Sequence, residues 1–212
     1  MGKAFYYVAR AIVKPLIWLL YGVNIKGKEN LQYTGRMLIA SNHTSMMDTL
    51  LIGCADRHQV HFMAKKELFS NKLGAWFFKS LGTFPVDRGK GDIAAVTAAG
   101  KILQENQTLV IFPEGTRNKE RQWQLAEFKN GAALIALRND APILPVCIVE
   151  KPRLFHRTKV VIGEAICLAD WTDDTLSRSE NIRRISTRLR DTILNLRARQ
   201  MTGRDRHENH SG

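Results

Sequence analysis

The chain has 212 residues, of which 44% are hydrophobic and 25% are charged. This is ordinary globular composition, which excludes a fibrous or largely disordered chain, and the length favours one domain with a sizeable core. The net charge of +12 is unusual and favours an anionic partner, namely nucleic acid, an anionic membrane surface or a phosphorylated substrate.

Residues 1–21 are apolar but are interrupted by Lys3, Arg10 and Lys14, which fall within one narrow arc of a helix at about 100° per residue. The uncharged stretch 15–25 is shorter than the run of about 20 apolar residues that a membrane-spanning helix needs. No cleavage site typical of a signal peptide follows. A basic amphipathic helix with aromatic residues at its end suits the plane of a membrane interface. The alternative is a helix packed on the core with a solvated basic face.

Residues 42–48, with the sequence NHTSMMD, lie between two apolar runs. The run before them, 37–40, is short and bounded by Gly-Arg, so it predicts a buried strand. The run after them, 49–52, predicts a helix, and Ser45 with Asp48 three residues later is typical of a capping box at its start. The sequence therefore predicts a histidine in the turn between a strand and a helix.

The spacing of His43 and Asp48 indicates that their side chains can interact if His43 lies in the turn. Within one helix, positions five apart point about 140° away from each other, so the two side chains would not meet. With His43 in the turn, the Asp48 carboxylate can reach back to the imidazole. One ring nitrogen is then held and the other is free to take a proton from a hydroxyl, as a general base does. The alternative is that Asp48 only caps the helix and His43 only closes the turn.

The remaining apolar runs predict the other elements. We expect strands at 23–26, 60–64, 108–112, 141–149 and 159–163, and helices at 92–105, 128–137 and 177–200. Strands that alternate with helices predict a single α/β domain with a mixed sheet flanked by helices. The expected organisation is a membrane-associating helix over 1–22, a domain over 23–201 and a disordered polar tail over 202–212.

Three cations stand at positions where a phosphate could bind. An apolar segment ends in Arg88, and PEGTR, ending in Arg117, follows the strand at 108–112. An arginine at a strand end offers a bidentate fork for a phosphate, and glycine lets the backbone approach a ligand closely. The alternative in both cases is a surface arginine paired with a nearby carboxylate. Lys129 opposes the dipole of the helix that follows unless an anion lies there.

The cysteines and two histidines near the third strand give no sign of a metal site. Cys54, Cys147 and Cys167 are isolated and odd in number, which favours a reduced cytosolic setting. His58 and His61 flank the start of the strand, but no third ligand is evident, so we expect ordinary histidines.

Four blocks in chain order resemble those of the glycerolipid acyltransferases of the 1-acyl-glycerol-3-phosphate acyltransferase type. The first, NHxxxxD with its HX4D motif, stands at 42–48, and the third, FPEGTR, is complete at 112–117. The second, a glycine six residues before an arginine, is similar to 82–88, and the fourth, a proline-containing apolar strand, to 143–146. The first and third together are highly specific, whereas the other two are weak alone. Pro85 stands where the family more often has an apolar β-former.

The resemblance implies transfer of a fatty acyl group from an acyl thioester, either acyl-CoA or acyl-carrier protein, to the free hydroxyl of a lysophospholipid. The product would be phosphatidic acid, made in phospholipid biosynthesis. His43 would be the general base and Asp48 would orient it, with direct attack on the thioester and no acyl-serine. The acceptor's glycerol phosphate would be held by five residues of the second and third blocks: Arg88, Glu114, Gly115, Thr116 and Arg117. Lys129 is a weaker candidate, from its charge alone. No metal or prosthetic group is implied.

We therefore expect a peripheral, monotopic enzyme on the cytoplasmic face of the cell membrane. Its partners would be a lysophospholipid, an acyl thioester and an anionic membrane surface, with acyl-carrier protein as one of two donors. The alternatives are an acyltransferase for another lysophospholipid or for glycerol-3-phosphate, a non-catalytic binder of anionic lipid, and a nucleic-acid-binding protein. A poised base argues against mere binding, and the lack of a helix-turn-helix, RRM or zinc pattern argues against nucleic acid.

Overall fold

One mixed sheet organises the chain, as the sequence predicts. The computed structural model describes residues 2–87, 93–118 and 125–208. Within these residues the strands lie in the order β1-β7-β6-β2-β5-β3-β4, and every pairing is parallel except that of β6 with β7. The strands are β1 (Asn24–Lys26), β2 (Met37–Ser41), β3 (Val60–Lys65), β4 (Thr83–Val86), β5 (Thr108–Ile111), β6 (Ile143–Ile148) and β7 (Lys159–Ile162).

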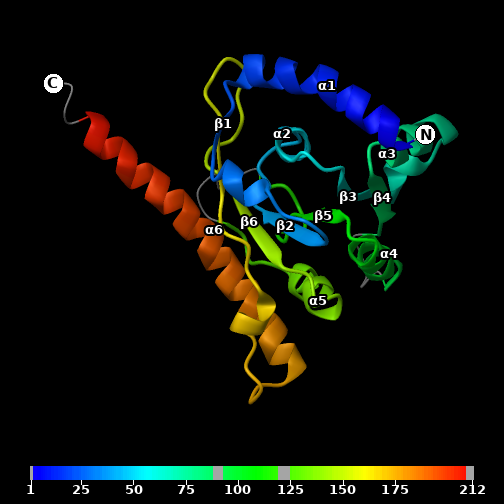
Figure 1. The fold of residues 1–212 in the computed structure, drawn as a ribbon, viewed down its shortest axis with the longest axis vertical. Coiled ribbons are helices and arrows are strands. Elements are labelled where there is room, and N and C mark those ends of the chain that lie inside the picture. The colour runs from blue at the N-terminus through cyan, green and yellow to red at the C-terminus, as the bar shows by residue number, and fades with distance from the viewer. Residues whose placement is uncertain (1, 88–92, 119–124, 209–212) are drawn as a thin grey trace.

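Helices cover both faces of the sheet (Figure 1). The α-helices are α1 (Gly2–Tyr21), α2 (Met47–Ala55), α3 (Lys72–Ser80), α4 (Ile93–Gln104), α5 (Gly131–Arg138) and α6 (Arg178–Glu208), and the short 3-10 helices are η1 (Lys28–Leu31), η2 (Lys66–Phe69) and η3 (Leu168–Trp171). Side chains of α4, α5 and α6 join the core on one face. On the other face α2 contributes to the core, and α1 packs on the outside of α2.

The central strand β2 is buried on both faces, which explains its uninterrupted apolar run. Leu38 and Ala40 belong to the core beneath α4, α5 and α6. Met37 and Ile39 point the other way and belong to the core on the side of α2. Since β2 pairs in parallel with both β5 and β6, the carboxyl ends of these three strands meet at one edge of the sheet. Ligand sites of open α/β sheets lie at this edge.

Two helices differ from the prediction. The helix predicted at 177–200 is α6, which continues beyond its predicted end to Glu208. No proline interrupts residues 202–208, so nothing in them breaks the helix outright, although Gly203 has a low helix propensity. Residues 209–212 lie outside the described residues. α3 is absent from the predicted helices, although Leu73, Trp76 and Phe77 follow helical spacing; it has only nine residues, fewer than the window in which a period is read. Its start is marked by Asn71, whose side chain accepts the backbone N–H of Gly74.

The amphipathic helix predicted at the N-terminus is present as α1, which lies along the domain (Figure 1). By length and composition alone, Lys3–Tyr21 could cross a membrane, although its longest uncharged stretch is short. The hydroxyl of Tyr6 donates to the Gly53 carbonyl at 3.1 Å, and the Leu20 carbonyl accepts the N–H of Phe155. Both ends of α1 are therefore attached to the domain.

The side chain of Asn42 joins the carboxyl ends of β2 and β6. Its Nδ2 donates to the Ile148 carbonyl at 3.0 Å, and its Oδ1 accepts the Ile148 N–H at 2.8 Å. Asn42 is 4% exposed, so water does not replace these bonds. The residue before the histidine thus anchors the turn to the sheet.

We predict that Asn42→Ala lowers the free energy of unfolding by about 2–5 kcal/mol, because both backbone groups of Ile148 lose a buried partner. Denaturant unfolding followed by circular dichroism measures the change. Asn195→Ala is the matched control, since Asn195 is exposed on α6 and its loss should cost less than about 0.5 kcal/mol. A cost below about 1 kcal/mol for Asn42→Ala would contradict the anchoring role.

Candidate active site

The structure brings His43 and Asp48 together, as their spacing predicts. His43 lies in the turn between β2 and α2, and its Nδ1 is 3.1 Å from Oδ2 of Asp48. The histidine is 7% exposed and the aspartate is fully buried. With Nδ1 facing the carboxylate, Nε2 is left to interact with a substrate hydroxyl.

Asp48 is fixed by more than the imidazole. Its Oδ2 also accepts the backbone N–H groups of Thr44 and Ser45, and its Oδ1 accepts the Thr44 hydroxyl at 3.3 Å. The bond from the Ser45 N–H is one half of the predicted capping box, while the Ser45 hydroxyl accepts the N–H of Met47 instead. Asp48 therefore holds the turn before α2 and orients the histidine at once, although the N-cap position of α2 is Met46 and makes no side-chain cap bond.

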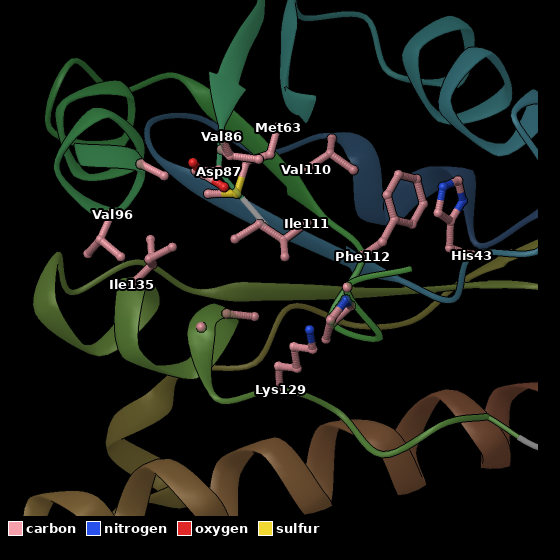
Figure 2. Close-up of a pocket in the computed structure, with 15 residues that line it drawn as sticks. His43, Met63, Val86, Asp87, Val96, Val110, Ile111, Phe112, Lys129 and Ile135 are labelled. Carbon is pink, nitrogen blue, oxygen red and sulfur yellow. The ribbon is translucent and has the colours of Figure 1, made fainter. Parts of the chain in front are cut away.

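Phe112, which directly follows β5, supports the imidazole. The two rings are stacked, with centroids 4.0 Å apart and planes 16° apart. Figure 2 shows Phe112 beside His43, between the histidine and the apolar part of the pocket. Between this ring and the Asp48 carboxylate, the imidazole has little freedom to rotate.

Glu114 lies behind the site, with both carboxylate oxygens engaged by backbone groups. Oε1 accepts the N–H of His43 at 2.9 Å and Oε2 accepts the N–H of Ala126 at 3.2 Å. The residue is 4% exposed. The structure thus gives Glu114 a place where it holds the backbone, whereas the resemblance implies a contact with the acceptor's phosphate.

The other residues implied as phosphate contacts differ in their surroundings. Gly115 has φ of +74°, and a Cβ placed there would come within 2.9 Å of Cε and Nζ of Lys129. The ammonium group of Lys129 therefore reaches the site. Thr116 and Arg117 are exposed on the loop that follows β5. Arg88 lies outside the described residues.

A pocket of about 260 Å³ begins at His43 and extends between the sheet and helices α4 and α5 (Figure 2). Figure 2 places Val96 and Ile135 at the end of the pocket away from His43, with Met63 and Val86 between. The lining is mostly apolar, and Lys129 projects into the pocket from the segment before α5, on the side opposite Phe112. The pocket can hold an extended apolar chain whose reacting end faces the imidazole.

A second histidine–carboxylate pair lies at the opposite edge of the sheet, where β3 and β5 begin. Nδ1 of His58 is 2.9 Å from Asp56, whose other oxygen accepts the hydroxyl of Tyr33. Burial, together with the Asp56 carboxylate, raises the pKa of Tyr33 above its ordinary value. None of these residues lines the pocket beside His43. We therefore assign this pair to the support of the fold.

His61 is separate from both pairs. Its Nδ1 is 3.1 Å from the Gly82 carbonyl, and burial lowers its pKa.

Within residues 2–87, 93–118 and 125–208, no three histidine, cysteine, aspartate or glutamate side chains gather where they could hold a metal ion.

Three features of the site were not predicted from the sequence. The anchor Asn42, the stacked Phe112 and the apolar pocket depend on contacts between segments far apart in the chain. Asn42 and Phe112 both stand at the carboxyl ends of predicted strands, and this position could have marked them as residues of the site. The pocket-lining residues give no such signal, because they resemble any other core residues.

Known proteins resemble this chain in sequence and in fold. Residues 22–149 match the family described as Acyltransferase. The 1-acyl-sn-glycerol-3-phosphate acyltransferase of Bacillus subtilis is 34% identical, over 75% of this chain and 81% of the relative. The enzyme of the same name from Helicobacter pylori is 32% identical, over 69% of this chain and 65% of the relative.

A solved structure shares the fold. The crystal structure of the 1-acyl-sn-glycerophosphate acyltransferase PlsC from Thermotoga maritima superposes with a TM-score of 0.68 and 23% identity, and covers 92% of this chain and 82% of that one. The family match spans more than half of the chain, and the Bacillus relative exceeds 30% identity over most of both proteins. The chain therefore belongs to the acyltransferase family.

Proposed function

We propose that the protein transfers a fatty acyl group from an acyl thioester to the free hydroxyl of 1-acyl-glycerol-3-phosphate and so makes phosphatidic acid. The observation that carries the proposal is the His43–Asp48 pair at the mouth of an apolar pocket that Lys129 also lines. The names of the similar proteins from Bacillus subtilis and Helicobacter pylori support the same reaction.

The chemistry follows from the imidazole. Nε2 of His43 takes the proton of the acceptor hydroxyl while its oxygen attacks the thioester carbonyl carbon. The carbon–sulfur bond then breaks, and the departing thiolate takes the proton back from the imidazolium. Asp48 holds the ring through Nδ1 and offsets the positive charge that forms on it. The thioester already carries an activated acyl group, so this scheme uses acyl-CoA or acyl-carrier protein as co-substrate and no further cofactor.

The pocket supplies the donor's acyl-chain site. Its apolar lining favours burial of a hydrocarbon chain, and its histidine end places the thioester carbonyl beside the base. Lys129 and the exposed Arg117 are the described cations placed to attract the acceptor's phosphate. Glu114 accepts the backbone N–H groups of His43 and Ala126, and we propose that it positions these two segments of the site.

α1 supplies the contact with the membrane from which a lysophospholipid must come. Val8, Ile12, Leu16 and Leu19 form an exposed apolar stripe along it. Because both ends of α1 are attached to the domain, we propose that it lies in the plane of the interface on the cytoplasmic side, as a monotopic anchor.

The general-base role is tested by His43→Ala and Asp48→Asn. We predict that phosphatidic acid formation from palmitoyl thioester and lysophosphatidic acid falls by about 10²–10⁴-fold in His43→Ala, because no other described group takes the proton. The activity of Asp48→Asn should fall by a smaller factor, because the ring of Phe112 still supports the imidazole. Mass spectrometry of the product, with circular dichroism to confirm folding, makes the measurement. A folded His43→Ala enzyme with near wild-type activity would refute the role.

The phosphate contact is tested by Lys129→Met, which keeps the apolar stem and removes the charge. We predict that KM for lysophosphatidic acid rises by about tenfold or more, with little change in kcat, because a charge-assisted bond is lost. Lys101→Met, at an exposed position of α4, is the matched control and should leave both constants unchanged. An unchanged KM in Lys129→Met would remove this residue from the acceptor site.

The acyl-chain site is tested by Val96→Phe, which fills the end of the pocket away from His43. We predict that kcat/KM for a palmitoyl donor falls by about tenfold relative to an octanoyl donor, because only the longer chain reaches the added ring. Ala94→Phe, exposed on the same helix, should not change the ratio. Equal losses of kcat/KM for both donors would mean that the donor's acyl chain binds elsewhere.

A further inference from the structure

The loop between β6 and β7, residues 149–158, exposes a pair of large apolar side chains. Leu154 is 52% exposed and Phe155 is 81% exposed, and we call these two residues the apolar tip. Neither the base, the pocket nor the phosphate site uses them. Adjacent aromatic and aliphatic side chains in a polar loop mark an interaction surface.

The backbone at the apolar tip is unusual for such residues. Phe155 has φ of +60°, in the left-handed region that bulky side chains rarely adopt. The turn is nonetheless well held, because the N–H of His156 donates to the Arg153 carbonyl and its ring nitrogen lies 2.9 Å from the Leu154 carbonyl. The loop thus keeps an exposed phenylalanine in a conformation that would suit asparagine or glycine better, although the ring is little buried in the protein.

The loop is joined to the C-terminal end of α1. The N–H groups of Phe155 and Thr158 donate to the carbonyls of Leu20 and Tyr21. Gly22 has φ of +49°, and a Cβ there would lie 3.4 Å from the backbone of the loop at residue 157. In Figure 1 the yellow loop rises beside this end of α1. The apolar tip and the helix therefore belong to one surface.

The chemistry of this surface fits a lipid interface. The α1 stripe is between 53% and 79% exposed and continues toward the loop through Leu19. Exposed cations flank the apolar tip on both sides: Lys151, Arg153 and Arg157. Apolar side chains that enter the acyl boundary, with cations at the level of the headgroups, are typical of binding to anionic membranes.

We propose that the apolar tip inserts into an anionic membrane interface as a second contact beside α1. The inference rests on the proposed membrane contact of α1 and adds to it. A single helix lying on a membrane can still rotate about its own axis. A second contact, bonded to the end of that helix, fixes how the domain and its active site face the lipid.

The first test is flotation with vesicles of phosphatidylcholine and phosphatidylglycerol. Leu154→Asn/Phe155→Asn removes the apolar tip while asparagine tolerates the left-handed backbone. We expect the vesicle partition coefficient to fall by about tenfold or more. Ile93→Asn, at a position 79% exposed on α4, is the control and should bind as the wild type does. Unchanged partitioning of the double variant overturns the proposal.

Activity separates this proposal from the proposed function. In detergent micelles the double variant should make phosphatidic acid at the wild-type rate, since the apolar tip does not line the pocket. Loss of flotation with retained activity supports the membrane contact. If the double variant instead changes the mass of the lipid-free protein in solution, the apolar tip joins two copies of the chain and the proposal fails.

A fluorescent label gives a second, independent readout. Cys54 and Cys147 are buried and Cys167 is exposed, so a Cys167→Ser background leaves Phe155→Cys as the reactive thiol. An environment-sensitive label at this position should shift its emission to the blue when the same vesicles are added. Unshifted emission while the labelled protein floats with the vesicles would overturn the proposal.

Discussion

The parallel pairing of β2 with β5 is the constraint on which the candidate active site depends. Ala40 lies opposite Ile111, so the two chains leave the sheet side by side at its carboxyl edge. The turn after β2 carries His43, and the turn after β5 carries Phe112 and Glu114. A slip of one residue in this pairing would exchange the two faces of a strand and separate the imidazole from its aromatic support.

A buried carboxylate then ties these turns to the rest of the site. Glu114 accepts one backbone N–H from His43 and another from Ala126, which leads into the segment that carries Lys129. Acidic side chains are rarely buried unless their oxygens have donors, and here both do. One side chain therefore links the turn of the proposed base to the segment of the proposed phosphate contact.

The surface of the molecule divides in a way that suits a lipid substrate. α1 and the loop between β6 and β7 lie beyond α2 on one face of the sheet, whereas α4, α5 and α6 cover the other (Figure 1). The pocket lies between the sheet and α4 and α5, and its histidine end opens at the carboxyl edge. A hydrocarbon chain entering from a membrane would thus meet the base before it meets the end of the pocket.

Local patterns predicted the strands, the turn of His43 and its contact with Asp48, because each depends on residues close in sequence. The mixed sheet and the family resemblance were predicted as well. The place of Glu114 was not, since a motif does not show whether a carboxylate faces substrate or backbone. The helix α3 was not predicted, because its nine residues are too few for a reliable period. The pocket was not predicted, because its lining residues come from segments far apart in the chain. The predicted end of α6 at residue 200 was too early, because the polar residues that follow carry no apolar period.

The most direct test of direct attack is rapid mixing of the enzyme with acyl-CoA or acyl-carrier protein in the absence of an acceptor. If His43 acts only on the acceptor's hydroxyl, no thiol is released above spontaneous hydrolysis until lysophosphatidic acid is added. A rapid burst of thiol, equal in amount to the enzyme and formed without acceptor, would reveal an acyl-enzyme. It would contradict the role of His43 as a base that acts directly on the substrate.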